Sequence, residues 1–313
     1  MRTKVIIDCD PGIDDAVALA MALFDPRLEV LAITATAGSI SAEQATDNVQ
    51  AIINQLDPPR FPRIGRAISI AHAPVYDDGY LHGPQGLGEF KAQTSQRQHT
   101  PTSDKVIAEL LRMHPGQVSL ICLGPLTNLA RMLQRDGSVV DFIDKVFVSG
   151  GTVRCNGNVT AAAERNIFFD PPAAHAVFRS PITKSIIPLD ITDGVTFGVD
   201  LLEKLPGRET RAGKLLHQLL LYAFRAHHQK LGREMIPLQD PVTMIAALEP
   251  ALFQWQQMPA DVEVEGGITR GMTVFDRRHV REPQTDIEVA IGVEKEEVRR
   301  QIVRGLQYAG QQT

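Results

Sequence analysis

Residues 5–24 read VIIDCDPGIDDAVALAMALF. Three apolar residues open this segment, four aspartates follow within eight positions, and an apolar run at residues 16–24 closes it. The first run is typical of a buried strand and the last of a buried helix, and Pro11-Gly12 between them is typical of a turn. The segment therefore predicts a strand, a short turn and a helix, in that order.

The same alternation continues along the chain. Strands are predicted at residues 5–8, 30–36, 118–123, 145–149 and 184–189, and helices at residues 14–24, 42–55, 103–113, 126–133 and 172–178. A long helix is predicted at 208–230, antiparallel strands at 262–266, 272–275 and 286–291, a final helix at 294–308, and a polar surface loop at 91–103. This order predicts one α/β domain over residues 1–313, with an open, mostly parallel central sheet covered by helices and a small antiparallel addition near the C-terminus.

The composition excludes several classes of protein. The 313 residues include 32 Lys and Arg against 37 Asp and Glu, a net charge of −5, which argues against a nucleic-acid partner. The longest apolar run is about half of the roughly 18 residues that a membrane-spanning helix needs, and the N-terminus has no signal-peptide core. The three cysteines form no CxxC pair, and we expect them to be small buried residues. We therefore expect a cytoplasmic protein without a membrane partner.

The four aspartates of the first segment carry the chemistry. Asp8 and Asp10 share one strand face, and Asp14 and Asp15 fall in the first helical turn, where the helix dipole favours anions. Capping and solvation alone would explain the second pair equally well. The whole cluster needs a cation or a solvated loop, because the carboxylates repel one another. Oxygen ligands of this kind indicate Ca²⁺ or Mg²⁺ rather than zinc.

Two further polar segments follow predicted strands. Residues 124–128, GPLTN, come directly after the strand at 118–123, and residues 156–166 contain three Asn residues and Glu164. Ligands bind beyond the carboxyl ends of parallel strands, so these amides and this carboxylate could hold hydroxyl groups. Each segment by itself is also explained as an ordinary turn.

Together, these segments resemble the inosine-uridine-preferring nucleoside hydrolase family. The opening DCDPGIDDA is similar to the family's DTDPGxDDA, with Cys9 in place of Thr. The resemblance extends over nearly the whole chain, through residues 82–88, 124–128, 157–166, 170–171 and 239–241. It implies hydrolysis of the N-glycosidic bond of a ribonucleoside, with ribose and the free base as products. It also implies a calcium ion at the carboxyl edge of the sheet and a homo-oligomer, either a dimer or a tetramer.

The resemblance assigns roles to individual residues. The implied calcium ligands are Asp10, Asp15, the main-chain carbonyl of Thr127, and Asp240, with Asp10 also acting as the catalytic base. The implied substrate contacts are Asp14, His82, Asn158, Glu164, Asn166 and Gln239.

Three positions depart from the family pattern. Gln239 stands where many members have a His that is thought to protonate the departing base, Ser39 stands where an Asn is usual, and Arg165 replaces an aromatic residue. Because Gln cannot deliver a proton as an ionisable acid does, a ribose- or nucleoside-binding protein with little hydrolysis is the first alternative. A phosphatase of the haloacid-dehalogenase type is the second, since residues 8–10 fit its DxD motif, although Pro11-Gly12 does not continue that motif. We expect His227 and His228 to be ordinary surface residues of the long helix.

Overall fold

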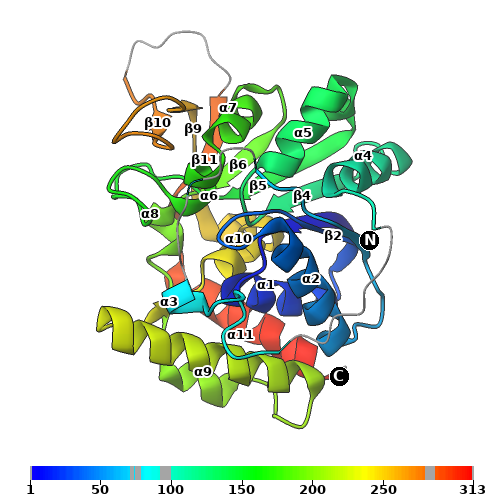
Figure 1. Ribbon diagram of the computed structural model, residues 1–313, viewed down its shortest axis with the longest axis vertical. Coiled ribbons are helices and arrows are strands. Elements are labelled where there is room, and N and C mark those ends of the chain that lie inside the picture. The colour runs from blue at the N-terminus through cyan, green and yellow to red at the C-terminus, as the bar shows by residue number, and fades with distance from the viewer. Residues whose placement is uncertain (1, 71–73, 75–78, 92–99, 279–285, 312–313) are drawn as a thin grey trace.

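The computed structural model describes residues 2–70, 74, 79–91, 100–278 and 286–311. Its strands are β1 (Thr3–Cys9), β2 (Leu28–Ala35), β3 (Arg63–Gly65), β4 (Val118–Cys122), β5 (Ile143–Ser149), β6 (Lys184–Ile187), β7 (Thr196–Phe197), β8 (Ile236–Pro237), β9 (Phe253–Val262), β10 (Thr273–Phe275) and β11 (Asp286–Val293). A nine-stranded sheet with the order β10-β9-β11-β6-β5-β4-β1-β2-β3 forms the centre of the molecule (Figure 1), and β7 and β8 pair separately.

The seven strands β3, β2, β1, β4, β5, β6 and β11, which are consecutive in the sheet, run parallel to one another. Strands β9 and β10 are antiparallel to their neighbours. The predicted mostly parallel sheet with an antiparallel addition near the C-terminus is therefore confirmed. The chain runs from β1 to β2 on one side of β1 and returns to β4 on the other side. Such a reversal of strand order leaves a crevice beyond the carboxyl ends of the strands, where ligands bind.

Helices cover both faces of the sheet (Figure 1). They are α1 (Ile13–Phe24), α2 (Ala42–Leu56), α3 (Gly79–His82), α4 (Ser103–Met113), α5 (Thr127–Arg135), α6 (Arg165–Phe169), α7 (Pro171–Arg179), α8 (Leu189–Thr192), α9 (Arg211–Leu231), α10 (Gln239–Leu248) and α11 (Lys295–Gln311), with 3₁₀ turns at Gly137–Phe142, Val199–Lys204 and Pro250–Leu252. One hydrophobic core joins the sheet to α1, α2, α9, α10 and α11, and a second core joins it to α4, α5 and α7.

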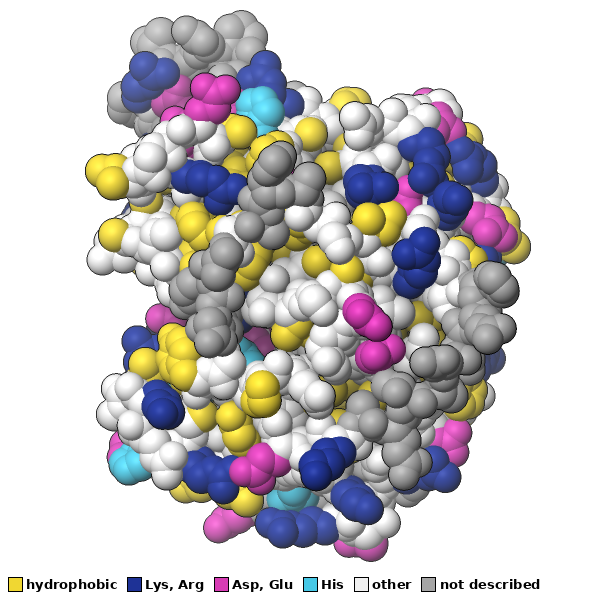
Figure 2. Space-filling view, in the orientation of Figure 1, with side chains coloured by type: hydrophobic (Ala, Val, Ile, Leu, Met, Phe, Trp, Pro, Cys, Tyr) yellow, Lys and Arg dark blue, Asp and Glu magenta, His cyan; other side chains and the backbone are white. Residues whose placement is uncertain are grey.

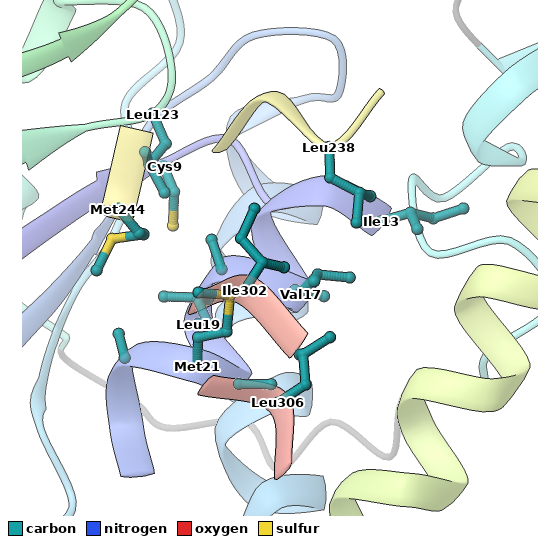
Figure 3. Close-up of a cluster of buried hydrophobic side chains, with 14 of the residues drawn as sticks. Cys9, Ile13, Val17, Leu19, Met21, Leu123, Leu238, Met244, Ile302 and Leu306 are labelled. Atoms are coloured by element: carbon teal, nitrogen blue, oxygen red, sulfur yellow. The ribbon is translucent and has the colours of Figure 1, made fainter. Parts of the chain in front are cut away.

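Helix α1 is buried on nearly all sides. An apolar helix of this kind must be surrounded by other elements, and Figure 3 shows Val17, Leu19 and Met21 of α1 beside Ile302 and Leu306 of α11. These five side chains are at most 2% exposed. Their dense packing leaves α1 little freedom to shift. The aspartates in its first turn are therefore held on a rigid support.

One predicted strand in the C-terminal part of the chain was wrong. The strand predicted at 262–266 lies at 253–262, because its first half, FQWQQ, is rich in polar residues and contains no apolar run. The strand β11 is antiparallel to β9 but parallel to β6, so it extends the parallel sheet rather than the antiparallel addition. Most of the surface loop predicted at 91–103 lies outside the described residues. Cys9 and Cys122 are buried as expected, whereas Cys155 is exposed.

Charged side chains of both signs are interspersed over the face shown in Figure 2. In the part of the chain that the structure describes, we find no helix with the length and apolar character needed to cross a membrane.

Candidate active site

Two helix N-termini meet at the carboxyl end of β1. Asp15, in the first turn of α1, accepts a hydrogen bond from the Gly12 N–H at 2.9 Å. Asp14 Oδ2 accepts two hydrogen bonds from the first turn of α10, from the main-chain N–H groups of Gln239 at 2.8 Å and Asp240 at 3.1 Å. Because the positive ends of both helix dipoles face this point, it favours negative charge. The structure thus brings Asp240 to the aspartates of the first segment.

The four carboxylates of this cluster, Asp10, Asp14, Asp15 and Asp240, all have a raised pKa, chiefly because they are buried. Burial raises the pKa of Asp10 to about 6 and that of Asp14 to about 7. Burial, followed by repulsion from Asp10, raises the pKa of Asp15 well above its usual range, and burial with repulsion from Asp15 does the same to Asp240. Buried like charges at this density are relieved either by protonation or by a cation.

Two oxygen atoms of the cluster lack a hydrogen-bond partner. They are Asp14 Oδ1 and Asp15 Oδ1, and both are buried. A buried carboxylate oxygen without a partner is costly, so each is suited to a ligand. The side chains are not already arranged as a closed site, because among the described residues no three His, Cys, Asp or Glu side chains converge closely enough to hold a metal ion by themselves.

Asp10 is held between two glycines. A Cβ atom on Gly38 would lie 2.2 Å from Asp10 Oδ2, and one on Gly124 would lie 2.6 Å from Oδ1. The Ser39 N–H and hydroxyl both donate to Oδ2, at 3.1 and 3.0 Å. Ser39 therefore orients Asp10, and the two glycines leave room for its carboxylate. Neither glycine had a predicted role, although Gly124 opens the segment noted at residues 124–128 and Gly38 also follows a predicted strand.

Asp8 lies in the interior behind this cluster. Its Oδ1 accepts hydrogen bonds from Thr34 Oγ1 at 2.6 Å and Asn128 Nδ2 at 2.8 Å. Asn128 also donates to the Ala35 carbonyl at 2.9 Å, so it ties the turn at 124–128 to two neighbouring strands. Burial raises the pKa of Asp8 to about 7. The sequence analysis assigned no role to Thr34 or Asn128, although both are polar residues beside apolar strands.

Thr127 is the first residue of α5, and its hydroxyl donates to Asp170 Oδ2 at 2.7 Å. This contact ties the start of α5 to the N-cap residue of α7. The predicted metal role of the Thr127 carbonyl stays a prediction.

The predicted ribose contacts come from the segment after β5. Glu164 caps α6, and its carboxylate accepts hydrogen bonds from the N–H groups of Gly151, Asn166 and Ile167. Asn166 Nδ2 donates to the carbonyls of Leu123 at 2.7 Å and Ser149 at 3.0 Å, which links the ends of β4 and β5. Both residues are buried at the sheet edge, and their hydrogen bonds give each of them a local structural role. Their role toward substrate stays a prediction.

Arg165 and His82 lie beside each other, although they are 83 positions apart. Arg165 Nη1 is 3.4 Å from His82 Nε2, and Asn158 Oδ1 accepts from the Arg165 main-chain N–H at 2.9 Å. A guanidinium group can only donate, so Nε2 is the acceptor and His82 is neutral. Burial, together with the charge of Arg165, lowers the pKa of His82 to about 3.

A cavity of about 660 Å³ adjoins this pair. Its lining includes Asn158, Arg165, His227, Arg233 and Gln239. His227 is partly buried and lines this cavity, so it is less exposed than an ordinary surface residue, and its predicted lack of a role toward a ligand stays a prediction. Burial lowers its pKa, which keeps it neutral near pH 7. His228 is exposed as expected and pairs with Glu234.

The chain matches known proteins along almost its whole length. A family model described as inosine-uridine preferring nucleoside hydrolase matches residues 5–300. The pyrimidine-specific ribonucleoside hydrolase RihA of Shewanella sp. (strain MR-4) is 33% identical over 299 residues, 95% of this chain and 93% of that protein. The inosine-uridine preferring nucleoside hydrolase of Crithidia fasciculata is 28% identical over 317 residues, 99% of each chain. The solved structure of a purine-preferring ribonucleoside hydrolase from Gardnerella vaginalis has a TM-score of 0.89, with 28% identity over 98% of this chain and 99% of that one.

Proposed function

This chain belongs to the inosine-uridine preferring nucleoside hydrolase family, and we propose that it is a calcium-dependent enzyme that hydrolyses ribonucleosides to ribose and the free base. Because the chain belongs to this family, the alternative of a haloacid-dehalogenase-type phosphatase is excluded. The observation that carries the proposal is the cluster of Asp10, Asp14, Asp15 and Asp240 at the carboxyl edge of the sheet, in which Asp14 is half-buried and the other three are buried.

The donor set of this cluster suits calcium. All four side chains offer oxygen atoms, and two of these atoms are buried without a partner. Calcium takes about 6–8 oxygen ligands, including carbonyl groups and water, and it tolerates irregular geometry. We propose that Asp10, Asp15, Asp240 and the Thr127 carbonyl hold it, with side-chain rotation closing the site. When bound, the ion would polarise water and orient the ribose hydroxyls.

The other steps of the proposed reaction are assigned to residues of the chain itself. Asp10, oriented by Ser39, accepts the proton of the attacking water. Asp14, Asn158, Glu164 and Asn166 contact the ribose, and the negative charge of the cluster favours the positive charge that develops on the sugar. The base then extends into the cavity lined by Gln239 and Arg165.

A nucleoside-binding protein with little hydrolysis is the second candidate. It is favoured by Gln239, which has no ionisable group, and by His82, whose pKa is lowered to about 3.

One assay separates the two candidates. Purified protein is incubated with inosine, guanosine, uridine and cytidine, and reducing sugar is measured before and after treatment with a chelator, and again after calcium is restored. We expect ribose release that the chelator abolishes and calcium restores. Asp10→Ala should lose this activity, whereas Asp200→Asn, a change of an exposed aspartate, should keep it. Binding without ribose release would favour the second candidate, and full activity in chelator would exclude the role of calcium.

The predicted homo-oligomer and the cytoplasmic location remain proposals. Light scattering of the purified protein tests the first, with a dimer or tetramer as the expected result.

A further inference from the structure

We propose that Arg165 stabilises the negative charge on the departing nucleobase, as a permanent cation in place of a proton-donating side chain. The inference rests on the proposed function and concerns the part of the same site that would hold the nucleobase.

The main chain holds Arg165 at the boundary between the carboxylates and the cavity. Glu164 caps the helix that Arg165 begins, and Asn158 accepts the Arg165 N–H at 2.9 Å. The guanidinium group reaches His82 Nε2 at 3.4 Å and lines the cavity together with Gln239. Its positive charge also acts on Asp10, Asp14 and Asp240, so the guanidinium group lies near the carboxylate cluster.

The neighbouring side chains are poor proton donors. Gln239 does not ionise, and His82 is neutral with Nε2 as an acceptor. His227 Nδ1 lies 2.9 Å from the Ala223 carbonyl, which fixes the proton of the neutral ring on that nitrogen and points it away from a ligand. Among the described residues that line the cavity, Arg165 is a partly buried cation, whereas Arg233 is exposed.

Without an acid to protonate it, the nucleobase leaves as an anion, and this anion must be stabilised. As the bond between C1′ and the base nitrogen breaks, its electron pair stays on the base and spreads over ring nitrogens and carbonyl oxygens. The water oxygen bonds to C1′, its proton passes to Asp10, and the base anion takes a proton from solvent after departure. Arginine remains charged throughout, because its pKa exceeds about 12, and its N–H groups match such acceptors. Removing one preorganised donor to a developing anion typically costs about 10²–10³ in kcat.

The test compares poor and good leaving groups. Arg165→Met keeps most of the side-chain volume and removes the charge. We expect kcat to fall about 10²–10³-fold with inosine or uridine, and less than about tenfold with p-nitrophenyl riboside, whose leaving group needs little stabilisation.

Arg270→Met is the matched control. Arg270 packs over the ring of Phe168 and donates to its carbonyl at 2.8 Å, so it supports the same helix without lining the cavity. A merely structural effect, as in this control, should change the rates for both kinds of substrate by the same factor. Melting temperature and bound metal are measured for both variants.

The outcomes separate the two proposals. If the wild-type protein releases ribose from no substrate, the proposed function fails. If the wild type is active but Arg165→Met slows inosine and p-nitrophenyl riboside equally, or slows neither, the inference about Arg165 fails while the proposed function stands.

Discussion

Replacing Gly38 by alanine tests how closely the loop after β2 encloses the proposed catalytic base. The new methyl group would lie 2.2 Å from Asp10 Oδ2 and 2.6 Å from its Cγ. Ordinary van der Waals contact begins at 3.4 Å, so the carboxylate or the loop must move by about 1.2 Å, the difference between 3.4 and 2.2 Å. Gly38 is not among the glycines with positive φ, so its backbone accepts alanine and the effect is steric.

The displacement should act on catalysis more than on folding. A shift of about 1 Å in a reacting group can lower the rate about 10²-fold. It would also disturb the two hydrogen bonds from Ser39 to Asp10, at 3.0 and 3.1 Å. We therefore expect Gly38→Ala to retain its fold and to lose about 10²-fold in kcat.

The assay is ribose release over a range of nucleoside concentrations, with melting temperature measured in parallel. Gly137→Ala is the matched control, because a Cβ there would meet no atom within 4 Å. The control should match the wild type in both measurements. A Gly38→Ala protein that folds and hydrolyses within about threefold of the wild type would refute the conclusion that Asp10 is tightly enclosed.

Three further predictions concern the substrate and the pH. A site built to hydrogen-bond hydroxyls leaves polar groups unpaired with a deoxyribonucleoside, so kcat/KM for uridine should exceed that for deoxyuridine by up to about 10⁴–10⁵, with Asp14 as the proposed contact to the 2′-hydroxyl; comparable values would contradict this. Because Gln239 offers no proton, p-nitrophenyl riboside should be cleaved much faster than inosine, and an equal or higher kcat for inosine would show that another residue fully activates the leaving base. The pKa of His82 is lowered to about 3, from 6.5, so the unfolded chain binds this proton more readily and the free energy of unfolding decreases as pH falls from 6.5 toward 3, by up to about 1.4 kcal/mol per pH unit. Urea denaturation at pH 7 and pH 5 should show a smaller decrease for His82→Gln, and equal decreases would count against a neutral buried His82.

The local pattern of the sequence was sufficient for the parallel part of the fold and for three of the four carboxylates of the cluster. The strand, turn and helix of β1 and α1 follow from contiguous apolar runs and from Pro11-Gly12, because the contacts that define them span only a few residues. Asp10 and Asp15 are close for the same reason. Short elements such as β3 and α6 were missed, since a few residues show no periodicity.

Tertiary structure decided which distant groups join this cluster. Asp240 reaches Asp14 only because α10 packs against α1, and its main-chain N–H donates to the Asp14 carboxylate across 226 positions. The resemblance to a known family assigned Asp240 to the site, but neither periodicity nor spacing placed it there. The contact of Arg165 with His82, and the position of His227 in the cavity, likewise depend on how α3, α6 and α9 meet around the sheet edge. Such contacts depend on packing across the whole fold, and a sequence pattern records only the neighbours along the chain.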